Sequence, residues 1–106
     1  MVKRNKSREY TQKEVEEQFT TYITSCIHYW ENEKRVPDIR GKLKGLAHSI
    51  LVGIDGESLN LPKFILAPDP HPDDKPDNTR QGRNYFPENH KSKVKCNISG
   101  ELHESL

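Results

Sequence analysis

The side chains best suited to ligand recognition lie in residues 69–90, where imidazole, carboxylate, ammonium, guanidinium and phenol groups follow one another closely. A simple connector needs far fewer donors, acceptors and charges, whereas binding residues are often carried on loops that a scaffold positions. Tyr85 and Phe86 form an aromatic pair in this segment, and two arginines precede them. Such a combination suits a planar, anionic ligand such as a nucleotide. The predicted ligand-binding residues are His71, Asp73, Asp74, Lys75, Arg80, Arg83, Tyr85 and Phe86.

Two purely structural interpretations of the same segment stand beside this one. The aromatic pair would fold back as a lid over a small helical core. Asp69, Asp73 and Asp74 would form turns among the prolines, because an aspartate side chain bonds nearby backbone N–H groups.

His71-Pro72-Asp73-Asp74 directly follows an apolar stretch, Phe64-Ile-Leu-Ala67. This order resembles the His-Pro-Asp-Asp-Glu signature of the zinc-dependent N-acetylglucosaminyl deacetylases. The resemblance implies that His71 and Asp74 are zinc ligands and that Asp73 is the base. A zinc site of this kind needs three protein ligands, an open position and a carboxylate that takes a proton from bound water.

The sequence departs from that signature immediately after it. Lys75 stands where the family has glutamate, Pro76 follows, and the remaining chain is far shorter than the family's α/β domain. His90 or His103 is available as a third ligand, although no spacing requires either. A zinc-dependent hydrolase is therefore the alternative function, whereas the preferred interpretation has no catalytic residue and no cofactor.

A longer series of motifs resembles a set of small bacterial and prophage proteins. Its members are Ile54-Asp55-Gly56, the stretch from Pro70 to Lys75, Tyr85-Phe86-Pro87 and the stretch from Asn97 to Glu104. The resemblance implies a single unit to which the loop and the C-terminal helix both belong. It implies no activity and no ligand.

The front of the chain predicts two helices that pack as an antiparallel hairpin. Apolar residues recur at helical spacing from Thr11 to about Lys34, and Thr11 with Glu14 predicts a capping box. A second periodic segment runs from about Asp38 to Asp55, and Gly56 is placed to end it.

The second helix carries two distinct faces. Its apolar stripe, predicted to lie against the first helix, consists of Ile39, Leu43, Leu46, Ala47, Ile50 and Ile54. A glycine inside a helix costs about 1 kcal/mol of stability relative to alanine. The opposite face of the helix carries two glycines, and the close approach of another backbone would explain why glycine stands at both positions. The helix is therefore predicted to be covered on both sides, by the first helix and by the rear segment of the chain or a second copy. As the interface of a homo-oligomer, the predicted residues of this face are Gly41, Gly45, His48 and Val52.

The rear of the chain predicts two short strands and a final helical turn. Lys63–Ala67 and Lys93–Ile98 have strand composition, residues 68–87 are rich in proline and predicted to be irregular, and Ser99 is placed to cap a helix over 100–106. The predicted fold class is α+β, with an antiparallel helical hairpin packed on a two-stranded ribbon, a long proline-rich loop and a C-terminal helical turn. The predicted organisation is a basic flexible arm (1–10) and one small domain (11–106), in which 11–56 form the hairpin.

Charge and composition restrict the function classes. The chain has 106 residues, 17 basic and 16 acidic side chains and a net charge of +1, so no global field attracts a polyanion. A nucleic-acid-binding protein is kept as a second alternative because basic side chains gather locally. They are Lys3, Arg4, Lys6 and Arg8 in the N-terminal arm, and Lys91, Lys93 and Lys95 near the second strand.

The expected location is the cytoplasm, because the chain has no apolar stretch typical of a signal peptide or a membrane span. Cys26 and Cys96 are accordingly expected to be free thiols. The predicted function is that of a non-enzymatic binding module. It would be a phage or prophage protein that sequesters a small anionic ligand or inhibits a host protein.

Overall fold

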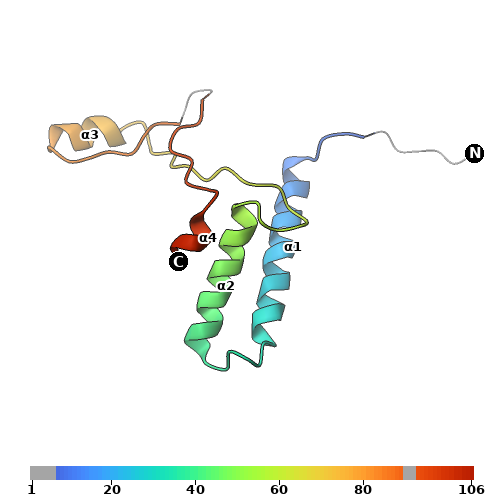
Figure 1. The fold of residues 1–106 in the computed structure, drawn as a ribbon. Coiled ribbons are helices and arrows are strands. Elements are labelled where there is room, and N and C mark those ends of the chain that lie inside the picture. The colour runs from blue at the N-terminus through green and yellow to red at the C-terminus, as the bar shows by residue number, and fades with distance from the viewer. Residues whose placement is uncertain (1–6, 90–92) are drawn as a thin grey trace, which may run out of the picture. The chain divides into compact units, whose positions relative to one another are not determined.

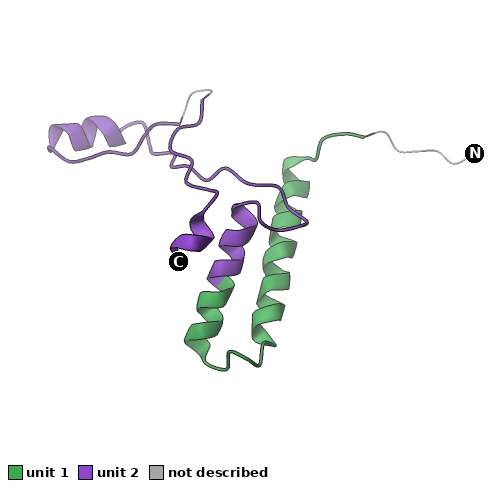
Figure 2. Ribbon diagram, in the orientation of Figure 1, with its two compact units in different colours: residues 1–46 green, residues 47–106 purple. Residues whose placement is uncertain are grey.

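The computed structural model of the chain describes residues 7–89 and 93–106. Four helices are present in this part of the chain (Figure 1): α1 (Gln12–Glu31), α2 (Ile39–Ile54), α3 (Asp74–Arg80) and α4 (Leu102–Ser105). The chain divides into two compact units, unit 1 (residues 1–46) and unit 2 (residues 47–106), coloured separately in Figure 2. The division falls inside α2 rather than at Gly56, where the helical periodicity of the sequence ends.

The predicted capping box begins α1. The Glu14 amide donates to the Thr11 hydroxyl at 3.2 Å, and the Thr11 amide donates to the Glu14 carboxylate at 2.9 Å. The guanidinium of Arg8 bonds the same carboxylate at 2.8 Å. These bonds, first those from Arg8 and then those from Thr11, lower the pKa of Glu14 to about 2.

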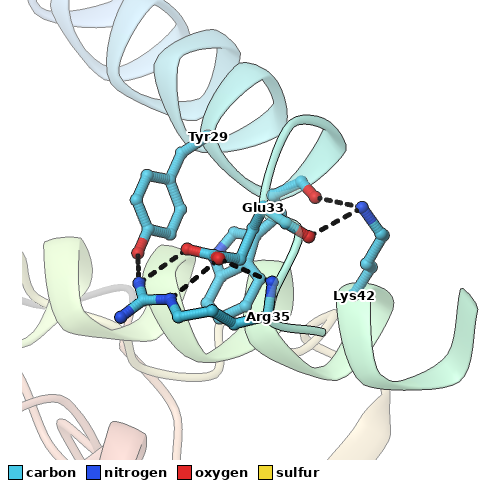
Figure 3. A network of polar contacts seen from close by, with 5 residues as sticks. Tyr29, Glu33, Arg35 and Lys42 are labelled. Atoms are coloured by element: carbon cyan, nitrogen blue, oxygen red, sulfur yellow. Dashed lines mark hydrogen bonds and ion pairs between the residues drawn. The ribbon is translucent and has the colours of Figure 1, made fainter. Parts of the chain in front are cut away.

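Lys42 ties the first turn of α2 to the last turn of α1 within unit 1 (Figure 3). Its ammonium donates to the backbone carbonyls of Trp30, Glu31 and Glu33 at 3.0–3.1 Å, and part of this set of bonds is drawn in Figure 3. The last carbonyls of a helix have no partner inside the helix, and a cation there also complements the helix dipole. One side chain of α2 therefore caps α1.

A second set of bonds shapes the connection between α1 and α2. The Arg35 guanidinium donates to the Glu33 carboxylate at 2.7 and 2.9 Å and to the Tyr29 hydroxyl at 3.2 Å (Figure 3). The hydrogen bond from Arg35 is the main reason that the pKa of Glu33 falls to about 2. The antiparallel course of α1 and the first half of α2, predicted from the short connection, is seen in Figure 1.

The glycine face of α2 contacts an aromatic ring in its own chain. A Cβ atom built on Gly45 would lie 2.6 Å from three atoms of the Trp30 indole, and one on Gly41 would lie 2.6 Å from Val36 Cγ1. The close approach that explains the glycines is thus made by side chains and not by another backbone. Ile39 and Leu43, predicted to pack on the first helix, are 77% and 61% exposed.

Gly56 ends α2 as the sequence predicts. Its φ of 83° is in the left-handed region that glycine adopts without penalty. The Glu57 amide donates to the Val52 carbonyl and the Gly56 amide to the Gly53 carbonyl, which is the Schellman pattern of helix termination.

The predicted two-stranded ribbon is wrong: Lys63–Ala67 and Lys93–Ile98 form no strand, and the described residues contain no sheet. The two segments do meet, since the Ile98 amide donates to the Leu66 carbonyl at 2.8 Å. The amides that a ladder would need are used elsewhere, because that of Phe64 donates to Ile54 at the end of α2 and that of Leu66 to the Asn97 side chain. The described chain is therefore helical, and the α+β class is not supported.

Residues 68–87 contain α3, which the sequence analysis did not predict. Pro76 is the third residue of this helix, where its missing N–H would have had no intrahelical partner in any case. Gly82, with φ 67°, ends it by a second Schellman pattern, in which the Arg83 amide donates to the Asn78 carbonyl at 2.8 Å.

Few apolar side chains are buried in this fold. In residues 7–89 and 93–106 the buried hydrophobic residues are Cys26 in α1 and Leu61 after α2. Cys26 and Cys96 are both free thiols, as predicted. No helix in the described part of the chain has the length and apolar character needed to cross a membrane.

Candidate functional site

The segment richest in predicted site residues is closed at its base by one side chain. The Asn89 amide nitrogen donates to the Pro68 carbonyl at 2.6 Å and to the Lys95 carbonyl at 2.9 Å. The Asn89 side-chain oxygen in turn accepts from the Lys95 amide at 2.6 Å. The two ends of residues 68–89, hereafter the closed loop, therefore lie at one point, as in compact loops whose ends lie close together.

Asp74 holds the interior of the closed loop together. Its carboxylate accepts from the Phe86 amide at 3.1 Å and from the Asn78 side chain at 3.1 Å. The first residue of α3 is thereby joined to the returning chain twelve residues later. A carboxylate engaged in this way has a structural role, although it joins distant residues and does not form the local turn that was the alternative interpretation of the aspartates.

The predicted ligand-binding residues partly bond one another. The Lys75 ammonium lies 5.4 Å from the centroid of the Tyr85 ring, in cation–π range, and the Arg80 guanidinium bonds the Asp77 carboxylate. His71 accepts from the Asp73 amide at 3.1 Å through its Nδ1 atom. The structure thus brings Lys75 beside Tyr85, and it leaves Arg83 exposed.

The aromatic pair of the closed loop is accessible. Tyr85 is 49% exposed and Phe86 is 62% exposed. The alternative, in which the two rings fold back as a lid over the helical core, predicts more extensive packing of both rings and is not favoured by this exposure. The loop combines a fastened backbone with two exposed aromatic side chains.

The residues proposed as zinc ligands are not assembled into one cluster. Among the described residues no group of three or more histidine, cysteine, aspartate or glutamate side chains is arranged to hold a metal ion. Asp74 is bonded within the closed loop, and His103 is bonded to Asp55. His90, the other candidate for a third ligand, lies outside the described residues.

The closing role of Asn89 is open to test. Asn89→Ala should leave the Lys95 amide and the Pro68 carbonyl without their partner, so hydrogen exchange of the Lys95 amide should accelerate at least about tenfold. Proteolytic cleavage between residues 68 and 89 should accelerate as well. Asn84→Ala, at an exposed asparagine of the same loop, is the matched control, and equal effects of the two substitutions would contradict the assignment.

A buried carboxylate that the sequence analysis did not select organises the rest of unit 2. Asp55, whose side chain is 0% exposed, accepts from the Gly100 amide at 2.6 Å and from the His103 amide at 2.8 Å. Its carboxylate also lies 2.6 Å from His103 Nδ1. Asp55 therefore caps the N-terminus of α4 from a position 45 residues earlier in the chain. The predicted cap, Ser99, bonds the Phe64 carbonyl instead.

The Asp55–His103 pair perturbs both groups. Burial acts to raise the pKa of Asp55, but the bonds from the His103 side chain and from the His103, Gly100 and Leu102 amides outweigh it and hold that pKa well below its usual value. The hydrogen bond to Asp55 raises the pKa of His103. Three further titratable groups face the imidazole: the ring of His48 at 5.8 Å between centroids, Glu104 and Glu57.

This pair makes unit 2 sensitive to alkaline pH. Because the folded pKa of His103 is raised, its contribution to stability is complete below the unfolded pKa of about 6.5 and is lost as pH rises through the folded value. Because the folded pKa of Asp55 is lowered, the contribution of Asp55 to stability is complete above about pH 4 and is lost in stronger acid. The melting temperature should therefore fall from pH 6 to pH 9, and His103→Gln should flatten that fall. His71→Gln, at an exposed histidine, should leave the profile unchanged.

The other predicted surfaces have mixed outcomes. Gly45 lies against Trp30 within unit 1, and the exposed ring of His48 has an edge contact with His103 within unit 2, so the homo-oligomer interface at this face stays a prediction. Arg8 of the basic arm is bonded to Glu14, whereas Lys93 and Lys95 are exposed. The remaining basic residues of that alternative lie outside the described residues; they are Lys3, Arg4, Lys6 and Lys91.

Comparisons with protein-family models, with curated proteins and with solved structures find no match to this chain. The two resemblances drawn from short motifs accordingly stay predictions.

Proposed function

We propose that this chain is a non-enzymatic interaction module that binds a partner protein through the closed loop. The observation that carries the proposal is the exposed pair Tyr85 and Phe86 on a backbone fastened by Asn89 and Asp74. A loop already held in shape loses little conformational entropy on binding. Aromatic and arginine side chains dominate the energetics of protein interfaces, and Arg83 is exposed in the same loop.

The charges of the closed loop favour a protein over a small anion. Its carboxylates outnumber its cations: the carboxylates are those of Asp69, Asp73, Asp74, Asp77 and Glu88, and the cations those of Lys75, Arg80 and Arg83. Two of these cations are already engaged, Arg80 by Asp77 and Lys75 by the Tyr85 ring. A phosphate group approaching the loop would therefore meet net repulsion. The motif resemblance to bacterial and prophage proteins makes a bacterial host protein the partner class to test.

Site-specific photo-cross-linking tests this proposal. p-Benzoylphenylalanine is introduced in place of Phe86, or in place of Tyr10 as an exposed aromatic control outside the loop, and the purified protein is irradiated in a bacterial lysate. We expect a discrete cross-linked protein from position 86 that is absent from position 10 and is lost when Tyr85→Ala is added. The same products from both positions, or no discrete product from position 86, would contradict the proposal.

A nucleotide titration separates the two ligand classes. ATP is added to the isotopically labelled protein, and amide chemical shifts of residues 68–89 are followed up to about 1 mM ATP, a range that detects even weak binding. We expect no saturating shifts in the loop. Saturating shifts confined to the loop would replace the protein partner by a nucleotide-like ligand.

A further inference from the structure

The strongest unexplained surface of the molecule is the apolar stripe of α2. Ile39 and Leu43 are 77% and 61% exposed, although they belong to the most regular apolar pattern of the helix. The stripe continues through four half-buried residues on the same helix: Leu46, Ala47, Ile50 and Ile54. On the opposite face of the helix, Trp30 covers Gly45 and His103 lies against His48.

We propose that this stripe binds the same stripe of a second copy of the chain, with the two α2 helices antiparallel. The stripe is its own complement under a two-fold axis that passes between Leu46 and Ala47. That axis opposes the residues in three pairs: Ile39 with Ile54 of the second copy, Leu43 with Ile50, and Leu46 with Ala47. At 100° per residue, the members of each pair lie symmetrically about the centre line of the stripe.

Self-complementarity is the property that a two-fold interface requires, because each surface must fit itself when reversed. A surface that binds an unrelated protein has no reason to match its own reverse in residue size and spacing. In this stripe a β-branched residue opposes a β-branched residue at both ends, and the small Ala47 opposes the larger Leu46 at the centre. Large and small side chains that alternate across a contact pack without voids.

Charge selects the antiparallel direction. The cations of α2, namely Arg40, Lys42 and Lys44, all lie in its first half, and His48 is the only basic side chain of the second half. A parallel pair would set these cations against one another. An antiparallel pair sets each cationic half against the second half of the other copy, close to the negative end of its helix dipole.

The composition of the core supports an obligate contact. In the described part of the chain, the buried hydrophobic residues are Cys26 and Leu61, which is little for a chain of this length. Covering Ile39 and Leu43 in the second copy's stripe would place apolar side chains from both copies in one shared core. The proposed surface differs from the predicted interface at Gly41, Gly45, His48 and Val52, which faces the chain itself at Gly45 and His48.

The molar mass in solution tests the existence of the dimer. Light scattering behind size exclusion should give twice the chain mass of 12.3 kDa for the wild-type protein at about 100 µM, a concentration at which even a weak dimer is populated. Leu43→Glu should raise the dimer dissociation constant at least about 100-fold, since it buries an unpaired carboxylate within the contact, opposite Ile50 of the second copy. Ile65→Glu, at a similarly exposed residue off the helix, should leave the dimer intact. A monomeric wild-type protein, or a dimer insensitive to Leu43→Glu, would overturn the proposal.

A charge-pairing experiment tests the register and does not depend on either variant folding alone. Leu43→Glu protein is mixed with Ile50→Lys protein, because position 43 of one copy should oppose position 50 of the other. The mixture should form a heterodimer with native helicity by circular dichroism, whereas a mixture of Leu43→Glu with Ile50→Glu should not. Failure of the first mixture to pair, or equal pairing in both mixtures, would contradict the antiparallel register.

Discussion

Asp55→Ala is expected to lower the melting temperature of the protein by at least about 10 °C. The substitution leaves the Gly100 and His103 amides and the His103 ring without the carboxylate that they share. Half-buried donors that lose their acceptor carry much of the cost of their desolvation. Because α4 has only four residues, it has little means of staying helical without this cap.

Asp55→Ala should reduce hydrogen-exchange protection mainly around α4, and less in the rest of the protein. Hydrogen exchange of the His103 amide in Asp55→Ala should approach the rate of an unstructured peptide, whereas amides of α1 should be affected far less. Asp55→Asn should recover only part of the loss, because its side-chain NH₂ would face donors. Glu101→Gln, at an exposed carboxyl group beside α4, serves as the control, and unchanged protection of the His103 amide in Asp55→Ala would contradict the capping role.

Gly45→Leu is expected to lower the free energy of unfolding by about 3 kcal/mol, the scale of overpacking in a closely fitted contact. Even the Cβ of Gly45→Ala would lie 2.6 Å from the Trp30 indole, so this smaller change should cost about 1 kcal/mol. Alanine otherwise stabilises the interior of a helix by about 1 kcal/mol relative to glycine. The sign of the alanine effect therefore reports whether the indole lies on Gly45.

A double-mutant cycle gives the decisive comparison. Trp30→Leu removes the far end of the indole, and in that background Gly45→Ala should stabilise the protein by about 1 kcal/mol in urea unfolding. Lys44→Ala, at the neighbouring exposed position, should have the same small effect in both backgrounds. If Gly45→Ala stabilises the protein while Trp30 is intact, the contact does not exist in solution.

How much of this protein could be predicted differs between its local and its long-range features. The capping box at Thr11 and the helix end at Gly56 were predicted correctly, because each depends on bonds between residues only a few positions apart. The helix α3 carried signals of the same kind in Pro76 and Gly82. The proline-rich composition of 68–87 nevertheless predicts an irregular segment, and the tolerance of the first helical turn for proline allows α3 within it.

The two predicted strands do not form, and the amino-acid composition of the segments does not show why. Lys63–Ala67 and Lys93–Ile98 lie near each other, but a ladder needs backbone donors and acceptors on both sides. The Phe64 amide bonds the end of α2, the Leu66 amide bonds a side chain, and Cys96 has a φ of 58° that breaks the extended course. The tertiary structure, and not the composition of the segment, decides which acceptor each backbone amide bonds.

The candidate site shows the same division. Its loop and the exposure of Tyr85 and Phe86 follow from composition, since a polar, proline-rich segment between helices belongs at the surface. Composition does not predict the hydrogen bonds by which Asn89 closes the loop, nor the pair formed by Asp55 and His103. The members of each contact are far apart along the chain, and no periodicity links them.

The sequence by itself determined the capping box that begins α1 and the glycine that ends α2, because capping acts within a few residues. Only the tertiary structure decided which face of α2 turns inward, because a glycine face and a leucine face are equally regular in sequence. The flat indole of Trp30 fits only where a side chain is absent, so it takes the glycine face and leaves Ile39 and Leu43 exposed. Close packing selects the inner face by shape as well as by hydrophobicity.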